Sequence, residues 1–401
     1  MNRRFTTLAT AAVVVTSTAL AAPAADAEQA PATAHDVRFA TFNASLNRST
    51  AGELLADLST PDDLQAAEVA EVVQRSRPDV LLLNEFDHVE GGAAVDAFRD
   101  NYLAVGHHGA APIDYPYSYT APVNTGVPSG MDLDNDGTVG GPGDAHGFGE
   151  FPGQYGMVVL SKHPINEGEV RTFQQFRWAD MPGALLPDDP ATPEPADWFS
   201  PEELKSVRLS SKSHWDVPVE VGGREVHLLA AHPTPPNFDG PEDRNGLRNN
   251  DEIRFWSDYV HPARGRYLYD DTGRRGGLAS GARFVIAGDH NSDPADGDSV
   301  PGAAKRLLTA HRVHDPEPAS AGAAEAARDQ GGANTGHHGP ARLDTADFSD
   351  DTPGNLRVDY VLPSWPLRPT DAGVFWPTAE DEASRLNDAS DHHLTWVDLR
   401  A

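Results

Sequence analysis

Apolar residues occur along the chain in short uninterrupted runs, a pattern typical of strands that are buried on both faces. These runs predict strands at residues 80–83, 157–160, 225–231, 284–287, 356–362 and 394–399. Two adjacent glycines, Gly222 and Gly223, separate the apolar segment 217–221 from the strand that follows. This arrangement predicts a β-hairpin turn.

A helical pattern begins after Thr60. Thr60 is a capping residue, Pro61 suits the first helical position, and two aspartates follow where they face the positive end of the helix dipole. The apolar residues then recur at three-four spacing: Ala66, Val69, Val72 and Val73. Pro78 ends the helix. Strands that alternate with helical segments, without an internal repeat, predict an α/β fold.

Three long polar stretches, rich in Gly, Pro, Asp and Ala, separate the predicted strands near residues 106–153, 174–201 and 316–353. They are longer than ordinary connections within a compact domain, and we interpret them as surface insertions. No segment resembles a linker between domains. We therefore expect residues 28–401 to form a single domain.

The first 27 residues have the layout of a secretory signal peptide. Arg3 and Arg4 form a positive start, residues 8–22 are apolar, and Ala25 and Ala27 fit the cleavage rule. We expect ordinary secretion; a twin-arginine route is the alternative, which the residues around Arg3 and Arg4 fit poorly. No later stretch is apolar over a membrane-spanning length. We expect a soluble, secreted monomer.

Composition narrows the chemistry. The 401 residues include no cysteine, which excludes disulfides, thiolate nucleophiles and cysteine-bound metals. Lys and Arg number 31 and Asp and Glu 61, so the net charge is −30. That charge disfavours tight electrostatic binding of nucleic acid. A bound divalent cation can still make one cleft of an acidic protein positive, so a nucleic-acid substrate is disfavoured but stays open.

Polar side chains stand where the predicted strands begin or end, except for Asp359, which lies inside the predicted strand 356–362. This set comprises Asn43, Glu85, His232, Asp289, Asn291, Asp359, Asp391 and His392. Any one such residue more often caps the next turn than binds a ligand. Six separate places along the chain that all offer oxygen or imidazole groups are much harder to explain in that way. Strand ends at one edge of a sheet are where α/β proteins bind ligands.

The order of these residues along the chain resembles that of the endonuclease/exonuclease/phosphatase superfamily. This superfamily includes pancreatic-type deoxyribonucleases, bacterial sphingomyelinases and inositol-polyphosphate 5-phosphatases. The resemblance rests on six motifs: Thr41-Phe42-Asn43, Leu83-Asn84-Glu85, Ala231-His232-Pro233, Gly288-Asp289-His290-Asn291, Arg357-Val358-Asp359-Tyr360 and Ser390-Asp391-His392. Each motif alone is weak, and their order is the specific signal. The resemblance implies a four-layer αββα sandwich of two mixed sheets flanked by helices. It also implies metal-dependent hydrolysis of a phosphate ester.

The resemblance further implies how the metal is held. Glu85 is the first candidate ligand, with Asn43 beside it and Asp391 at a second position or reaching the metal through water. Oxygen ligands of this kind suit a hard divalent cation, so we expect Mg²⁺, with Mn²⁺ or Ca²⁺ as alternatives. The residue two positions after Asn43 is Ser45, where some relatives keep a carboxylate. Whether one or two metals bind therefore stays open.

The remaining residues have implied catalytic roles. Asp289 and Asn291 are expected to orient the attacking water and the phosphate. His392, with Asp359 as its orienting partner, is either the general base or a phosphate-contacting imidazolium. His232 is expected to donate to a phosphoryl oxygen or to the leaving group. A histidine at this place disfavours the abasic-site repair branch of the superfamily.

The histidine between the two orienting residues is unusual, because an apolar side chain is common there among relatives. Strand alternation predicts that His290 points away from the site, as a packed or a surface residue.

An acidic loop, Asp132, Asp134 and Asp136 followed by Gly137, has the opening of a calcium loop. The terminal glutamate of an EF-hand is missing, since Gly143 stands at the twelfth position. A structural Ca²⁺ site and a merely solvated acidic turn are the two interpretations.

Two arginines follow His232 at four-residue spacing, Arg244 and Arg248. Arginines near a metal centre are candidate clamps for a substrate phosphate. The alternative is that they pair with neighbouring acids such as Glu242 and Glu252 and only tether the loop.

Two classes of function remain. The first is a secreted phosphoester hydrolase, and the second is a binding module that kept the fold and lost the chemistry. Because every motif keeps a chemically competent side chain, we favour the enzyme. Its substrate is expected to be a small or headgroup phosphate ester, with a metal-dependent nuclease as the alternative.

Overall fold

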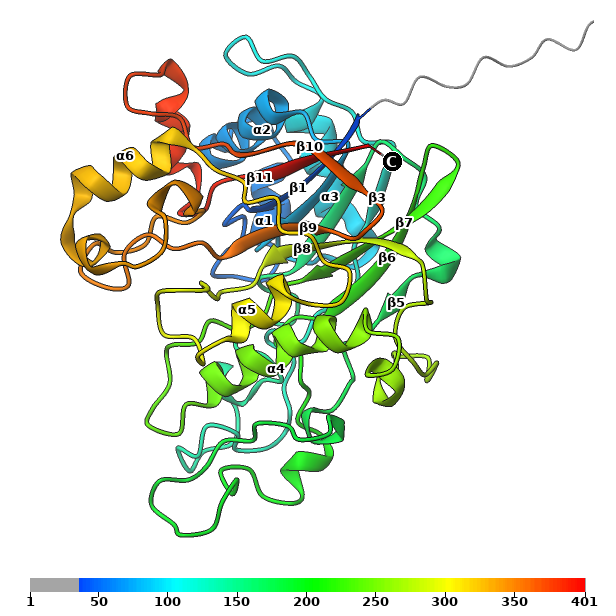
Figure 1. The fold of residues 1–401 in the computed structure, drawn as a ribbon, viewed down its shortest axis with the longest axis vertical. Coiled ribbons are helices and arrows are strands. Elements are labelled where there is room, and N and C mark those ends of the chain that lie inside the picture. Colours follow the sequence, from blue (N-terminus) through cyan, green and yellow to red (C-terminus); the bar gives the residue numbers. More distant parts are fainter. Residues whose placement is uncertain (1–35, 401) are drawn as a thin grey trace, which may run out of the picture. The chain divides into compact units, whose positions relative to one another are not determined.

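The computed structural model describes residues 36–400, so the predicted signal peptide (residues 1–27) lies outside the described residues. The described residues belong to one compact unit built on two mixed β-sheets (Figure 1). The first sheet has the strand order β10-β11-β1-β2-β4-β3 and the second has the order β5-β6-β7-β8-β9. The strands are β1 (Asp36–Asn43), β2 (Val80–Asn84), β3 (Tyr117–Tyr119), β4 (Met157–Ser161), β5 (Arg171–Thr172), β6 (His214–Val221), β7 (Arg224–Ala231), β8 (Arg283–Asp289), β9 (Asp359–Pro363), β10 (Arg368–Val374) and β11 (Thr395–Arg400).

Helices cover the outer faces of both sheets. They are α1 (Glu53–Leu58), α2 (Leu64–Ser76), α3 (Ala93–Phe98), α4 (Arg244–Tyr259), α5 (Ala303–Leu308) and α6 (Ala321–Gln330). Helices α1, α2 and α3 share a hydrophobic cluster with the first sheet. Helices α4 and α5 share one with the second sheet and lie along it in Figure 1. None of the helices within residues 36–400 is long and apolar enough to cross a bilayer.

Side-chain alternation explains why the strands are continuous apolar runs. In β2, Val80 and Leu82 belong to the core between the two sheets, whereas Leu81 and Leu83 pack against the helices outside. All four side chains are fully buried. A strand that is apolar on both faces is expected when each face is covered by another layer. The predicted four-layer arrangement of two mixed sheets flanked by helices is confirmed.

The strand directions bring the predicted site residues to one edge of the sandwich. Strands β1 and β2 are parallel, with Asn43 opposite Asn84, and β7 and β8 are also parallel. Strand β9 runs antiparallel to β8, so Asp359 at its start lies opposite Asp289 at the end of β8. Strand β11 is antiparallel to β1, and the residues before it arrive at the same edge.

Gly288 makes this edge possible. Its φ is +141°, and a Cβ placed there would lie 1.9 Å from the carbonyl oxygen of Ala231. No L side chain can be accommodated at that distance, so only glycine lets β8 approach the end of β7 this closely. The residues that follow Ala231 and Gly288, His232 and Asp289, are thereby held side by side.

Two boundary predictions are wrong. Helix α2 begins at Leu64 and not at Pro61, because the Asp63 carboxylate accepts a hydrogen bond from the Ala66 amide at 2.7 Å and caps the helix. Asp359 is the first residue of β9 and not an inner one, since Leu356 instead forms an isolated bridge with Ala346.

The segment after His232, treated as a loop from the sequence, contains the long helix α4. The three polar stretches also carry regular structure of their own. Strand β3 lies in the first stretch and pairs with β4 at the edge of the first sheet, and α6 lies in the third. The assignment of residues 28–401 as one domain with three insertions stays a prediction.

Candidate functional site

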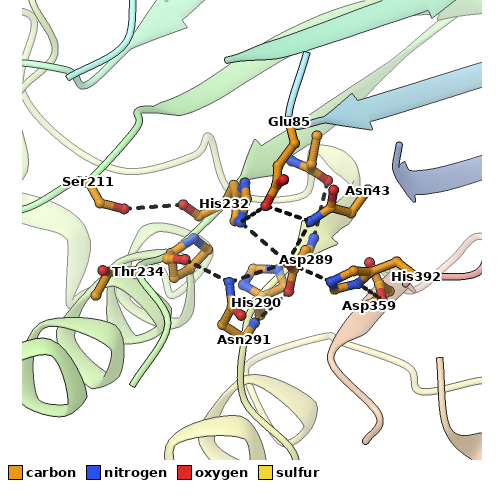
Figure 2. Close-up of polar contacts among 12 residues, drawn as sticks. Asn43, Glu85, Ser211, His232, Thr234, Asp289, His290, Asn291, Asp359 and His392 are labelled. Atoms are coloured by element: carbon orange, nitrogen blue, oxygen red, sulfur yellow. Dashed lines mark hydrogen bonds and ion pairs between the residues drawn. The ribbon is translucent and has the colours of Figure 1, made fainter. Parts of the chain in front are cut away.

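The predicted residues at the strand ends meet at one edge of the sandwich, as Figure 2 shows. These are Asn43, Glu85, His232, Asp289, Asn291, Asp359 and His392. They come from six different strands or strand ends, separated by up to several hundred positions along the chain. The fold therefore assembles the site, and no local segment contains it.

Asp289 lies at the centre of the cluster and is 1% exposed. Its Oδ2 accepts a hydrogen bond from Asn43 Nδ2 at 3.1 Å and lies 3.3 Å from His232 Nε2 and 3.7 Å from His392 Nε2. Its Oδ1 accepts from the backbone amide of Asn291 at 2.8 Å. Burial acts to raise the pKa of Asp289, but the two imidazoles hold it below its usual range. The group is a carboxylate at neutral pH.

His392 and Asp359 form a buried pair. His392 Nδ1 lies 2.8 Å from Asp359 Oδ2, and Thr345 Oγ1 donates to the same oxygen at 2.9 Å. Burial raises the pKa of Asp359 to about 6. Burial also opposes the charge on His392, yet the carboxylates of Asp359 and Asp289 raise the pKa of His392 well above its usual value. We assign the shared proton to His392, because the ring has a carboxylate on each side.

His232 is the contrasting imidazole. It is 2% exposed, and its Nε2 lies 3.3 Å from Asp289 Oδ2 and 4.0 Å from Glu85 Oε1. Burial and the nearby Lys212 ammonium lower the pKa of His232. The site thus pairs one neutral imidazole with one imidazolium, on opposite sides of the same carboxylate.

Glu85 and Asn43 form a polar corner, in which Asn43 turns its Nδ2 toward Glu85 and its Oδ1 accepts from the Ser45 amide at 3.2 Å. Glu85 has a left-handed backbone, with φ of +57°, which turns its side chain into the site at the end of β2. Its Oε1 accepts from Asn43 Nδ2 at 3.1 Å, and its Oε2 accepts from Asn47 Nδ2 at 2.8 Å. The Glu85 side chain is 24% exposed, whereas that of Asp289 is 1% exposed, so Glu85 is the accessible carboxylate. Carboxylate and amide oxygens are the donor set that Mg²⁺ prefers.

The cluster also contains a second group able to hold a metal. Ligand atoms of Asp289, Asp359 and His392 all lie within 4.8 Å of one another. Asp391, in contrast, is exposed, and its Oδ1 accepts from Ser45 Oγ at 3.3 Å. The predicted ligand Asp391 is therefore connected to the Glu85 corner through Ser45.

The two predicted clamp arginines differ in their surroundings. Arg248 donates to three backbone carbonyls, those of Leu209, His146 and Arg208, at 2.8, 2.5 and 2.9 Å. Arg244, the first residue of α4, has one acidic neighbour, Glu242 Oε1 at 3.7 Å from its Nε. Arg248 thus joins segments together, whereas Arg244 is held only loosely.

The acidic loop folds around its own backbone. Oxygens of Asp132, Asp134 and Asp136 lie within 4.8 Å of one another, and the Asp136 amide donates to Asp132 Oδ1 at 3.1 Å. The buried Asp144 closes the loop by accepting from the Leu133 amide at 2.6 Å. The loop has the compactness of a cation-binding turn without the helices of an EF-hand.

Sequence reasoning missed Lys212. Its side chain is buried, at 6% exposed, and within residues 36–400 it has no carboxylate oxygen at 4.0 Å or less. Glu85 and Asp289 are close enough for their charges to act on its pKa, although burial lowers it. The hairpin predicted at Gly222 and Gly223 could have indicated that Lys212 lies near His232. Its register places the residues just before His214 beside those just after Ala231.

His290 is packed and takes no polar part in the site. It is 0% exposed, neither ring nitrogen has a hydrogen-bond partner among residues 36–400, and its ring lies 5.8 Å from that of Tyr360. Burial lowers its pKa to about 4, so the ring is neutral.

Replacing this ring with an apolar side chain removes two unsatisfied polar atoms. We expect His290→Leu to raise the stability by about 1 kcal/mol and the melting temperature by roughly 2 °C. Hydrolytic activity should stay within about threefold of the wild type, since no contact of the site is lost. Calorimetric melting together with rate measurements tests this, and a lower melting temperature would show that the ring supports the packing.

Comparison with known proteins agrees with this architecture. A profile of the Endonuclease/Exonuclease/phosphatase family matches residues 40–392, a range that contains every residue of the cluster, from Asn43 to His392. Among curated proteins no significant match is found.

Several solved structures are similar to the chain. An endonuclease/exonuclease/phosphatase from Beutenbergia cavernae DSM 12333 has 18% identity and a TM-score of 0.49, with 91% of this chain and 71% of that chain covered. A family protein from Leptotrichia buccalis C-1013-b has 13% identity and a TM-score of 0.47, covering 91% and 100%. Sphingomyelinase C from Streptomyces griseocarneus has 14% identity and a TM-score of 0.43, covering 91% and 99%. Because the family profile matches most of its length, the chain belongs to the endonuclease/exonuclease/phosphatase family, whose members are metal-dependent phosphoesterases or nucleases.

Proposed function

We propose that the chain is a secreted, metal-dependent hydrolase of small or headgroup phosphate esters, with residues 28–401 acting as one catalytic domain. The observation that carries the proposal is the assembly around Asp289, where a carboxylate, a neutral imidazole and an imidazolium meet beside the accessible carboxylate of Glu85. A binding module without activity would not need to keep this set of ionisation states.

Glu85 and Asn43 would hold the divalent metal, with Asp391 as a further ligand acting through water. The metal, Mg²⁺ with Mn²⁺ or Ca²⁺ as alternatives, would neutralise phosphoryl charge and lower the pKa of a bound water. Asn43 also donates to Asp289, so the amide ties the metal-binding corner to the catalytic carboxylate.

The protein groups divide the remaining work. Asp289, ionised and held by Asn291 and two imidazoles, accepts a hydrogen bond from the attacking water and orients it toward phosphorus. His392 keeps a proton at Nε2, because Asp359 occupies its other nitrogen, and donates it to a phosphoryl oxygen. His232, neutral, is placed to hydrogen-bond the phosphate or the leaving oxygen.

The charge of the chain favours a small substrate over a polynucleotide. With a net charge of −30, the surface repels a long polyanion, whereas a single phosphate ester needs only one local positive site. A secreted nuclease is the second candidate, because other members of the family have that activity.

A substrate panel tests the proposed function. The purified protein is expected to hydrolyse 4-nitrophenyl phosphate or bis(4-nitrophenyl) phosphate with Mg²⁺ and to lose this activity in chelator. Plasmid DNA and sphingomyelin in the same panel separate the nuclease and headgroup alternatives. If no substrate is cleaved under any metal condition, the chain is an inactive member of the family. The presence of the processed protein in culture medium tests secretion.

Calcium binding by the acidic loop stays a prediction. If Asp132, Asp134 and Asp136 hold Ca²⁺, saturating calcium should stabilise the protein by about 2 kcal/mol and raise the melting temperature by roughly 4 °C relative to chelator. Asp134→Asn should remove most of this shift, and Asp188→Asn, in another exposed loop, should leave it unchanged. The same shift in both variants would place the calcium elsewhere.

A further inference from the structure

A cavity of about 700 Å³ opens beside Glu85. Its walls come from two of the polar stretches, at residues 125–148 and at Trp178 and Phe199, from residues 207–212, and from the segment that leads into α4. Lys212 lines the cavity close to the catalytic cluster. A volume of this size is typical of small-molecule sites. The cavity therefore continues the catalytic site into a space lined by segments outside the two sheets.

Four cationic side chains line this one cavity: Arg208, Lys212, Arg244 and Arg248. They belong to a chain in which 61 acidic residues outnumber 31 basic ones. Within residues 36–400, Arg244 alone of the four has a carboxylate oxygen at 4.0 Å or less, Glu242. Only Glu85 and Asp134 contribute acidic groups to the lining.

Structural roles explain Arg248 but not the other cations. The Arg248 guanidinium is hydrogen-bonded to three carbonyls, which fixes one wall. Within the described residues, the Arg208 side chain makes one hydrogen bond, from Nη1 to Asn124 Oδ1 at 2.7 Å. The Lys212 side chain is 6% exposed, and within the described part of the chain its ammonium, which lines the cavity, has no hydrogen-bond acceptor. An ammonium that lines a cavity and has no acceptor of its own is free to bind an anionic ligand there.

The lining also has an apolar component. Phe148 and Phe238 are 62% and 84% exposed, unusual values for phenylalanine, and both line the cavity. Trp178, Phe199 and Leu133 are buried and line it as well. A ligand that is anionic throughout would not use these surfaces, which suit an apolar or aromatic scaffold.

We propose that this cavity binds the part of the substrate beyond the scissile phosphate and selects phosphate esters that carry a second anionic group on a small apolar or aromatic scaffold. Lys212 lies toward the scissile phosphate, Arg208 and Arg244 bind the second anion, and the aromatic side chains contact the scaffold. The inference rests on the proposed function, because it names the substrate class of that same site.

Binding is tested first, with the full chain in Mg²⁺ buffer and ligands that have no ester bond. By titration calorimetry, p-xylylenediphosphonate, with two phosphonates on one ring, should bind at least about tenfold more tightly than benzylphosphonate. Arg244→Gln and Arg208→Gln should each reduce this ratio severalfold, and Arg208→Lys should restore part of it. Lys305→Gln removes the same charge from an exposed position on α5 and should leave the ratio unchanged. Equal affinity for the two ligands, or equal ratios in all variants, overturns the proposal.

Hydrolysis then separates this inference from the proposed function. Phenyl phosphate is compared with its 4-phosphonomethyl derivative, and the methyl diesters of the two compounds are compared in the same way. In each pair the 4-phosphonomethyl compound should have a kcat/KM about tenfold higher. Hydrolysis without this preference would overturn the cavity proposal and leave the proposed function standing. Binding preference without any hydrolysis would overturn the proposed function and would leave the cavity only as a binding site for ligands with two anionic groups.

A final comparison identifies the source of the second anion. The derivative is offered in solution and, with a hexadecyl chain attached, in phosphatidylcholine vesicles. Faster hydrolysis in solution identifies a soluble ester, and faster hydrolysis in vesicles identifies a lipid headgroup; either supports the proposal when Arg244→Gln reduces that rate. A rate that Arg244→Gln leaves unchanged in both presentations overturns it.

Discussion

Glu85→Gln is expected to lower kcat/KM for phosphate ester hydrolysis by about three orders of magnitude or more. The substitution keeps the size of the side chain and removes the accessible carboxylate of the cluster. Both Glu85 oxygens accept hydrogen bonds from asparagine amides, those of Asn43 and Asn47. In the variant, the NH2 group of the glutamine replaces one of these oxygens and faces a donor, so one acceptor is lost. Loss of charge and loss of this acceptor both weaken the binding of a hard cation.

Two measurements make this prediction specific. The dissociation constant for Mn²⁺ should rise by at least about tenfold in Glu85→Gln, while the melting temperature in chelator changes little, since the side chain is partly exposed. Glu90→Gln, which neutralises an exposed carboxylate a few residues further on, is the matched control and should have wild-type kinetics. Wild-type activity that survives complete removal of metal would contradict the role of Glu85.

The sequence could predict the site because most of its residues stand at or beside the end of an apolar strand, which can be recognised from a short stretch of sequence. Glu85 directly follows the buried strand β2, His232 directly follows β7, and Asp289 is the last residue of β8. Parallel pairing of those strands then brings the residues to one edge, whatever the loops between them do. The hairpin glycines, Gly222 and Gly223, were also sufficient to predict the register of β6 against β7. Both glycines have positive φ, as expected for a two-residue hairpin turn.

The cavity could not be predicted in this way. Its walls depend on how long polar stretches pack against one another, and no periodic pattern records that packing. Arg248 illustrates the difference: its spacing from Arg244 suggested a pair of clamps, but its donors are used by the carbonyls of Leu209, His146 and Arg208. Such contacts join segments that are far apart in sequence, and only the folded chain reveals them.

His392→Ala is expected to lower kcat by about two to four orders of magnitude, because the variant loses the proton that His392 holds toward Asp289. Asp359→Asn should have a smaller effect of the same kind. The asparagine still supports the ring, but without the carboxylate the imidazole loses the main charge that raises its pKa. His290→Leu, at a neighbouring buried histidine, is the control and should keep its activity.

The double variant gives the sharpest result. If Asp359 acts through His392, then His392→Ala combined with Asp359→Asn should lose no more activity than His392→Ala alone, since one proton is removed in either case. Independent roles would instead give losses that multiply. A multiplied loss would mean that Asp359, which shares the metal-sized cluster with Asp289 and His392, acts on the phosphate or its metal directly. The Mn²⁺ dissociation constant of Asp359→Asn then distinguishes the two roles. It should be unchanged if Asp359 only orients the imidazole, and it should be raised if Asp359 binds the cation.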